Sequence, residues 1–220
     1  MKGLCLISTG IDSPVAAYKM QKLNWKLDFV HFKTDERAIP ILKKQIKQLG
    51  KPARLFIVPQ DYMSKLSQKS HKRVSCILCK RMMYRLAEAL AHRYGHNAII
   101  TGENLGQVAS QTLDNLIVLS VAAKIPILRP LLPFEKNDII DIAKQIGTYE
   151  LSISLKENCP FLPKNPATRS RIRVIEQEES DVDFPKLIEE TLAKLRVLEI
   201  RPRKGLVETK RAPLDFPVSG

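Results

Sequence analysis

The sequence lacks any apolar stretch long enough to cross a bilayer, which takes about 20 residues. The most apolar segments are Leu116–Ala123 and Ile125–Leu128. The N-terminus carries one lysine and a short apolar run, with neither the apolar core nor the small-residue cleavage site of a signal peptide. We therefore expect a cytoplasmic protein with no membrane partner.

Cysteines and aromatic residues are also few. Four cysteines are too few for a disulfide framework in a cytosolic chain, but the pair Cys76 and Cys79 has the Cys-x-x-Cys spacing of metal or redox sites. With 7 Phe, 5 Tyr and 1 Trp, the chain shows no aromatic platform for stacking bases. There is no internal repeat and no low-complexity segment.

Acidic residues are scarce relative to basic ones. The chain has 36 Lys and Arg against 23 Asp and Glu, a net charge of +13. This excess favours a polyanionic partner, with nucleic acid first, although a solvated basic surface is the alternative. Basic clusters occur at Lys43-Lys44, at 69–73 and at 169–173, and each taken alone is more typical of a solvated face.

Short apolar segments alternate with segments of helical spacing. Apolar residues make up 44% of the 220 residues, enough for a sizeable core. The alternation predicts an α/β fold, an open parallel sheet with helices on both faces and a ligand crevice at the carboxyl ends of the strands. Expected strands are 3–7, 27–32, 53–58, 98–101 and 126–128; expected helices are 13–23, 38–49, 82–93, 105–121, 138–146 and 184–197.

The segment Ser8-Thr9-Gly10-Ile11-Asp12-Ser13 joins the first strand to the first helix. A small Gly-containing turn at a helix N-terminus presents backbone N–H groups to an anion, and serine hydroxyls add donors. A carboxylate repels phosphate, so we interpret Asp12 as a Mg²⁺ ligand or as a residue that orients the turn. The alternative is an ordinary capped turn.

This segment resembles the Ser-Gly-Gly-x-Asp-Ser signature of the PP-loop ATP pyrophosphatases, with Thr9 where that family usually has its first glycine. A longer resemblance, from about Leu4 to Pro166, is to the catalytic domain of the ThiI family, the tRNA uridine sulfurtransferases. It is carried by Lys80-Arg81-Met82-Met83, Thr101–Thr112, Leu128-Arg129-Pro130-Leu131 and Ile146-Gly147-Thr148.

The resemblance implies a PP-loop (adenine nucleotide alpha hydrolase-like) fold that uses ATP and Mg²⁺. It implies adenylation of uridine O4 in tRNA, release of pyrophosphate, and replacement of the oxygen by sulfur to give 4-thiouridine. Asp12 and Cys159 would be catalytic. The ATP-binding residues carried over are Leu6, Ile7, Ser8, Thr9, Gly10, Asp12, Ser13, His31, Phe32, Lys80, Gly102 and Gln111.

The resemblance also gives the cysteines a role. Cys159 occupies the place of the family's sulfur-handling cysteine, and Cys76 and Cys79 lie at the start of a helix, where backbone amides favour thiolates. Together the three could hold a [4Fe–4S] or [3Fe–4S] cluster, as archaeal ThiI proteins do. Zinc, a redox disulfide and unligated thiols are the alternatives. Cys5, in a buried strand, is interpreted as a core residue.

We expect two parts: a PP-loop domain over 1–166, and a C-terminal helix with a basic tail over 167–220. The THUMP and rhodanese-like domains of many ThiI proteins are expected to be absent. The tRNA would then be held by the basic surface, by a homodimer partner or by a separate RNA-binding protein, with sulfide or a persulfide carrier as sulfur donor. The rival hypotheses are a PP-loop enzyme acting on another RNA base or a small molecule, and a non-catalytic ATP-binding sulfur carrier.

Overall fold

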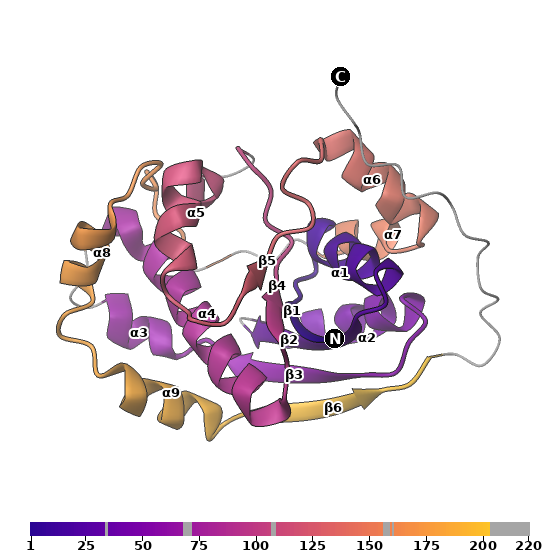
Figure 1. Ribbon diagram of the computed structural model, residues 1–220, viewed down its shortest axis with the longest axis horizontal. Coiled ribbons are helices and arrows are strands. Elements are labelled where there is room, and N and C mark those ends of the chain that lie inside the picture. Colours follow the sequence, from indigo (N-terminus) through magenta and orange to yellow (C-terminus); the bar gives the residue numbers. More distant parts are fainter. Residues whose placement is uncertain (34, 68–71, 107–108, 156–158, 160, 203–220) are drawn as a thin grey trace.

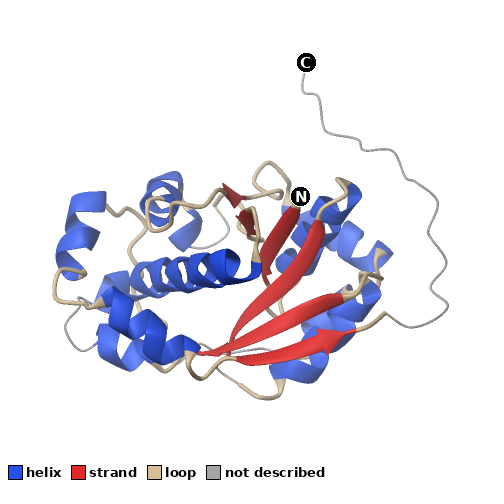
Figure 2. Cartoon of the chain, turned by 60° about the horizontal axis from the view of Figure 1, so that its bottom comes forward, coloured by secondary structure: helices blue, strands red, loops and turns tan. Residues whose placement is uncertain are grey.

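The computed structural model describes residues 1–33, 35–67, 72–106, 109–155, 159 and 161–202. Its centre is a twisted six-stranded sheet with the order β5-β4-β1-β2-β3-β6 (Figures 1 and 2). The strands are β1 (Lys2–Leu6), β2 (Lys26–Lys33), β3 (Ala53–Pro59), β4 (Ala98–Ile100), β5 (Ile127–Leu128) and β6 (Arg196–Ile200). The first five strands run parallel, as the alternation predicts.

The sixth strand corrects one expectation. The segment 184–197 was expected to be a single helix, but helix α9 covers Phe184–Leu192 and the chain then returns as β6, antiparallel to β3. A segment as short as β6 does not distinguish a strand from the end of a helix by its apolar pattern alone. The free edge of β3 selects the strand, because an unpaired edge offers backbone partners that a helix cannot use.

Helices cover both faces of the sheet (Figure 1). Because strand side chains alternate between faces, Cys5 packs toward one layer and its neighbour Leu4 toward the other. Cys5 is fully buried, which confirms its expected core position. One layer contains α1 (Asp12–Lys22), α2 (Ala38–Gln48), α6 (Lys136–Gln145) and α7 (Tyr149–Ile153); the other contains α3 (Tyr62–Ser67), α4 (Ser75–Tyr94), α5 (Leu113–Ser120), α8 (Ile172–Glu178) and α9.

The segment expected to be helical over 105–121 is shorter in the structure. Gly106 has a φ of +75°, which is incompatible with an α-helix at this position. After a 3₁₀ turn (Ala109–Gln111), α5 begins behind Thr112, whose extended backbone and side-chain bond to the Asn115 amide make it the N-cap. Gln107 and Val108 lie outside the described residues. Helix α4, in contrast, begins seven residues earlier than expected, at Ser75.

The segment after residue 166 is tied to the sheet through buried charges as well as through β6. Arg81 and Arg85 on α4 both form two hydrogen bonds with the carboxylate of Glu179, at 2.7–2.8 Å. Burial opposes ionisation of Glu179, but the two guanidinium groups hold its pKa below the usual range. Residues 203–220, the basic tail of the expected second part, lie outside the described residues. The boundary at 166 stays a prediction.

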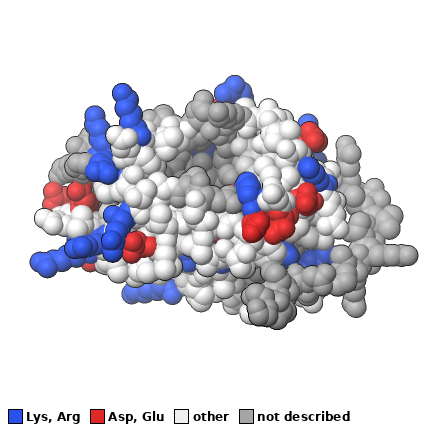
Figure 3. All heavy atoms as spheres, turned by 90° about the horizontal axis from the view of Figure 1, so that it is seen from above, with Lys and Arg blue, Asp and Glu red and all other residues white. Residues whose placement is uncertain are grey.

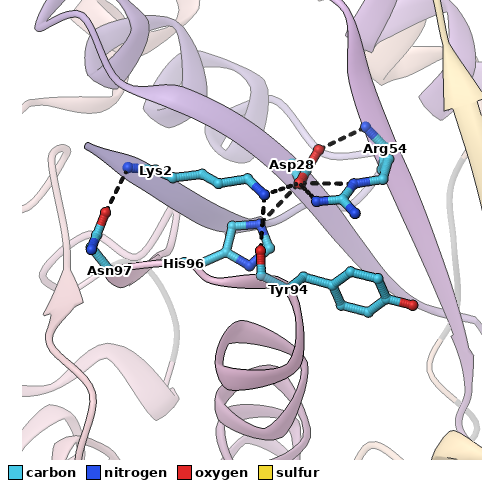
Figure 4. A network of polar contacts seen from close by, with 6 residues as sticks. All are labelled: Lys2, Asp28, Arg54, Tyr94, His96 and Asn97. Carbon is cyan, nitrogen blue, oxygen red and sulfur yellow. Dashed lines mark hydrogen bonds and ion pairs between the residues drawn. The ribbon is translucent and has the colours of Figure 1, made fainter.

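A second ionic network lies at the amino ends of the strands (Figure 4). Arg54 donates to Asp28 from its backbone amide, Nε and Nη2, at 2.8, 3.1 and 2.6 Å. His96 Nε2 lies 3.0 Å from the same carboxylate, and Lys2 Nζ lies 3.4 Å away. Lys2 also reaches the carbonyl of Tyr94. This network joins β1, β2, β3 and the end of α4.

None of the helices within the described residues is long and apolar enough for a membrane span.

Candidate nucleotide site and cysteine cluster

The loop from Ser8 to Ser13 lies at the carboxyl end of β1, the edge at which parallel sheets bind ligands. Its turn is closed by hydroxyl groups: the Ser8 amide donates to Ser13 Oγ at 2.9 Å, and the Gly10 amide lies 3.3 Å from Ser8 Oγ. Gln45 Nε2 donates to the Thr9 carbonyl at 3.2 Å. The loop is therefore held in place by its own side chains and by α2.

Thr9 fits this loop without backbone strain. Asn24 is the one residue other than glycine with a positive φ in the described part of the chain, so Thr9 has an ordinary backbone. Its side chain is buried. The replacement of the family's glycine therefore leaves the turn compatible with an anion cradle.

Asp12, the first residue of α1, forms an ion pair with Lys136, the first residue of α6. The two residues are 124 positions apart, and both side chains are partly exposed. Lys136 carries no local motif that would mark it as a site residue. A carboxylate and an ammonium group side by side at a phosphate-type loop can hold a metal ion and a phosphate oxygen, respectively.

Gly102, just after β4, is required by the loop itself. A Cβ atom at this position would lie 2.7 Å from the Ser13 amide nitrogen and 2.9 Å from the Asp12 carbonyl carbon. The end of β4 and the first turn of α1 therefore touch backbone to backbone. The structure thus gives Gly102 a packing role at the loop, and its expected contact with ATP stays a prediction.

Glu103 is the centre of a charged cluster beside Gly102. It is buried, and its carboxylate accepts from Lys80 Nζ at 3.1 Å, Arg129 Nε at 2.9 Å and the Tyr84 hydroxyl at 2.5 Å. Burial raises the pKa of Glu103, but Lys80, Tyr84 and Arg129 outweigh that effect and hold the pKa below its ordinary value. The predicted phosphate contact Lys80 thus lies at the correct edge, paired with a carboxylate.

The strand-end pairs lie as the parallel topology requires. His31 and Phe32 are neighbours on β2, and Leu6 and Ile7 end β1 one strand away, so all four reach the same edge. Because strand side chains alternate, His31 and Phe32 point to opposite faces. His31 Nδ1 lies 3.0 Å from the Ile7 carbonyl, which links the two strand ends.

Gln111 lies in the 3₁₀ turn before α5 and is buried, in contrast to a helix-surface position. Its carbonyl accepts from the Gly106 amide at 3.0 Å. Its side-chain oxygen is buried, with no hydrogen-bond partner among the described residues. An unmatched buried acceptor marks a group for which a ligand or water supplies the partner.

Two of the three cysteines of the predicted cluster share one helix end, and the third lies in the same region. Cys76 and Cys79 lie in the first turns of α4; burial and, to a smaller extent, the nearby Cys159 thiol raise the pKa of both. Cys159 is exposed, Cys76 is half-buried and Cys79 is buried. Gln60 Nε2 donates to Cys79 Sγ at 3.0 Å. Glu157, Asn158 and Pro160, which flank Cys159 in the sequence, lie outside the described residues.

The expectation of thiolates on α4 is corrected. Burial raises the pKa of Cys79 to about 12 and also raises the pKa of Cys76, so desolvation outweighs the helix N-terminus. In the described part of the chain, no three His, Cys, Asp or Glu side chains stand close enough together to hold a metal ion. As donors, three thiols suit an iron–sulfur cluster, and a bound metal would itself deprotonate them.

Charge is distributed unevenly around this edge. Figure 3 shows Lys and Arg gathered over the α8 side of the molecule, with Asp and Glu mixed with Lys over the α1 and α6 side. Arg169, Arg171 and Arg173, one of the predicted basic clusters, are exposed at the start of α8. Of the cluster at 69–73, only Lys72 and Arg73 lie within the described residues.

The family model described as Thiamine biosynthesis protein (ThiI) matches residues 1–184. The chain belongs to the ThiI family. A probable tRNA sulfurtransferase of Methanocaldococcus jannaschii is 46% identical over 175 residues, covering 76% of this chain and 46% of that protein. One of Caldanaerobacter subterraneus subsp. tengcongensis is 40% identical over 198 residues, covering 86% and 52%. The chain thus spans about half the length of the curated relatives it matches.

A solved structure agrees with this assignment. A 4-thiouridine synthetase in complex with RNA and bound ATP superposes with a TM-score of 0.86, at 38% identity over 91% of this chain and 55% of that one. An NMN synthetase from Francisella tularensis shares the fold alone, with a TM-score of 0.54 and 13% identity. Together these confirm the predicted PP-loop type of α/β fold.

Within this ThiI-family chain, the structure brings most of the predicted residues to one edge of the sheet. The loop, Gly102, Lys80 and the strand ends lie at the same edge, and Cys76 and Cys79 adjoin it on α4, which also carries Lys80. Three charged residues of the site were missed: Glu103, Arg129 and Lys136. Glu103 and Arg129 belong to two of the segments that carry the family resemblance. Glu103 directly follows Gly102 and Arg129 directly follows β5, and these positions could have marked them as site residues.

Proposed function

We propose that the chain is the adenylating and sulfur-transferring part of a tRNA sulfurtransferase. ATP binds at the carboxyl edge of the sheet, uridine O4 attacks the α-phosphate, and pyrophosphate leaves. Hydrosulfide held beside Cys159 attacks C4, AMP leaves with the C4–O bond, and loss of the sulfur-bound proton leaves 4-thiouridine. The observation that carries this proposal is the family match over 1–184, because it spans both the Ser8–Ser13 loop and Cys159.

In this proposal the loop amides and the Ser8 and Ser13 hydroxyls hold the pyrophosphate. Asp12 holds Mg²⁺, and Lys136, now paired with Asp12, faces the negative charge that develops on the phosphates. Since His31 and Phe32 face opposite sides of the sheet, we propose that adenosine is held mainly by the backbone at the strand ends. The position of Gln111, with its unmatched oxygen, supports a direct polar contact.

For the cysteines we propose a [4Fe–4S] or [3Fe–4S] cluster held by Cys76, Cys79 and Cys159. When bound, such a cluster would supply an iron that holds hydrosulfide, with sulfide as the source, or a persulfide carrier together with a thiol that reduces it. The Cys76 and Cys79 pair at the start of α4 and the hydrogen bond from Gln60 to Cys79 support this site. We also propose that the substrate is tRNA and that the protein is cytoplasmic. A second subunit or a separate RNA-binding protein would help to hold the tRNA.

The direct test is anaerobic reconstitution with iron and sulfide, followed by incubation with tRNA, ATP and sulfide. We expect AMP and pyrophosphate to be released and 4-thiouridine to appear in the digested tRNA by mass spectrometry. Cys159→Ser should abolish thiolation, whereas Cys5→Ala, at a fully buried core position, should retain it. AMP release with a small molecule but with no tRNA would instead favour another PP-loop activity.

A further inference from the structure

Glu103 binds two cations that come from different parts of the chain. Lys80 stands on α4 and donates to Oε1, while Arg129, directly after β5, donates to Oε2 through its Nε. The Tyr84 and Thr101 hydroxyls also donate to Oε2, at 2.5 and 3.3 Å. One carboxylate oxygen thus serves Lys80, and the other serves the remaining partners.

The two cations differ in their freedom to move. The Lys80 side chain is 26% exposed and its stem is flexible, whereas the Arg129 side chain is 13% exposed. Arg129 Nη2 is buried with no hydrogen-bond partner among the described residues. Lys80 is therefore able to turn toward a ligand at the strand ends, and Arg129 stays where it is.

A buried carboxylate cannot be left without a cation. Glu103 is 6% exposed, and an unpaired charge at that depth is strongly unfavourable. If Lys80 were its sole partner, a phosphate would have to compete with Glu103 for the ammonium group. With Arg129 in place, Glu103 remains compensated when Lys80 turns to the nucleotide.

We propose that Arg129 is a positioning residue of the ATP site: it neutralises Glu103 and thereby releases Lys80 for the phosphates. This inference rests on the proposed role of Lys80 as a phosphate contact. It predicts that Arg129 governs the binding of the phosphate groups of ATP and leaves the binding of adenosine unaffected.

The test is a double-mutant cycle on the full chain, read by calorimetric titration with Mg²⁺-ATP and, separately, with adenosine. Arg129→Gln should raise the Kd for ATP about tenfold, the scale of one charge-assisted contact, with the adenosine Kd unchanged. Adding Glu103→Gln to Arg129→Gln should restore ATP affinity to within about threefold of the native value, since no carboxylate then retains Lys80. A double variant as weak as Arg129→Gln alone would overturn the proposal, because Arg129 would then touch the ligand or only support the fold.

Three further variants keep the outcome interpretable. Arg129→Lys retains the positive charge and should stay within about threefold of the native ATP affinity; a loss equal to that of Arg129→Gln would also overturn the inference. Lys80→Met tests the underlying site: if ATP affinity is unchanged in that variant, it is the proposed role of Lys80 that fails. Arg54→Gln removes a similar guanidinium–carboxylate contact at the far edge of the sheet and should leave both Kd values unchanged.

Discussion

The two edges of the sheet each carry a buried carboxylate surrounded by cations, and they use it differently. At the amino edge, Asp28 receives three donors from Arg54 alone. Its partners Lys2 and Arg54 lie on β1 and β3, and His96 lies just before β4 (Figure 4). At the carboxyl edge, Glu103 receives one bond each from Lys80 and Arg129. The partners of Asp28 thus all come from the strands of the sheet or from the residues next to them.

The difference lies in the unused capacity for hydrogen bonding. Arg129 Nη2 is a donor that cannot become an acceptor, and it is buried without a partner among the described residues. The unmatched atom of the Asp28 network, His96 Nδ1, is a ring nitrogen that can remain an unfilled acceptor when Nε2 donates to Asp28. The Glu103 network is thus less completely satisfied than the Asp28 network, and one of its two cations, Lys80, is partly exposed.

The strongest test of this division is Asp12→Asn. We expect thiolation activity to fall by about 10²–10³-fold. The Asp12 carboxylate is proposed to hold Mg²⁺ at the phosphates, where it acts mainly in the transition state. The free energy of unfolding should change by less than about 1 kcal/mol, since the pair with Lys136 is partly exposed. Steady-state thiolation assays and urea unfolding measure the two quantities. A large stability loss with activity retained per folded molecule would place Asp12 in the scaffold.

Asp28→Asn should show the reverse pattern. The change leaves Arg54 and His96 without their anion, and we expect a loss of about 2–3 kcal/mol in the free energy of unfolding. ATP affinity of the folded protein should stay within twofold of native, as the network lies at the opposite edge. Urea unfolding and calorimetric ATP titration test both points. Weakened ATP binding at a temperature where the variant is fully folded would show that the edges are coupled.

Gly102→Ala is expected to have a smaller effect on stability and to act on the site. The added methyl would stand 2.7 Å from the Ser13 amide nitrogen, so the end of β4 or the first turn of α1 must shift. We expect a loss of about 1–3 kcal/mol in stability together with weaker ATP binding. Gly50→Ala is the matched control: its φ of +76° makes alanine unfavourable there, but nothing lies within 4 Å, so ATP affinity should be unaffected.

The sequence predicted what depends on short segments. Strands β1 to β5 and the loop at Ser8–Ser13 follow from local apolar runs and turn residues, and these alone place the crevice. What it missed depends on contacts between distant segments. Strand β6 needs the open edge of β3, and the pair Asp12–Lys136 exists because α1 and α6 begin at the same edge.

The cysteines show the same limit from the side of electrostatics. Their position at the start of α4 predicted thiolates, because helix termini lower a thiol pKa. The structure buries Cys79 under Gln60 and Tyr62, and the desolvation that raises its pKa to about 12 depends on packing that no spacing pattern contains. Burial in the tertiary structure therefore raises the thiol pKa, whereas the position at a helix start predicted that it would be lowered.

The smallest expected effect is the acid dependence of the Asp28 network. Burial opposes ionisation of Asp28, but His96 and Arg54 hold its pKa well below the ordinary value. Between the two pKa values the unfolded chain binds a proton that the folded chain does not, so stability falls as the pH falls. The contribution is complete above about pH 5, since an unfolded aspartate has a pKa of about 3.9, and it is lost below that range. The stability difference between the native chain and Asp28→Asn should therefore shrink from pH 5 toward pH 3 in urea unfolding. A difference that does not shrink would mean that the network acts through packing alone.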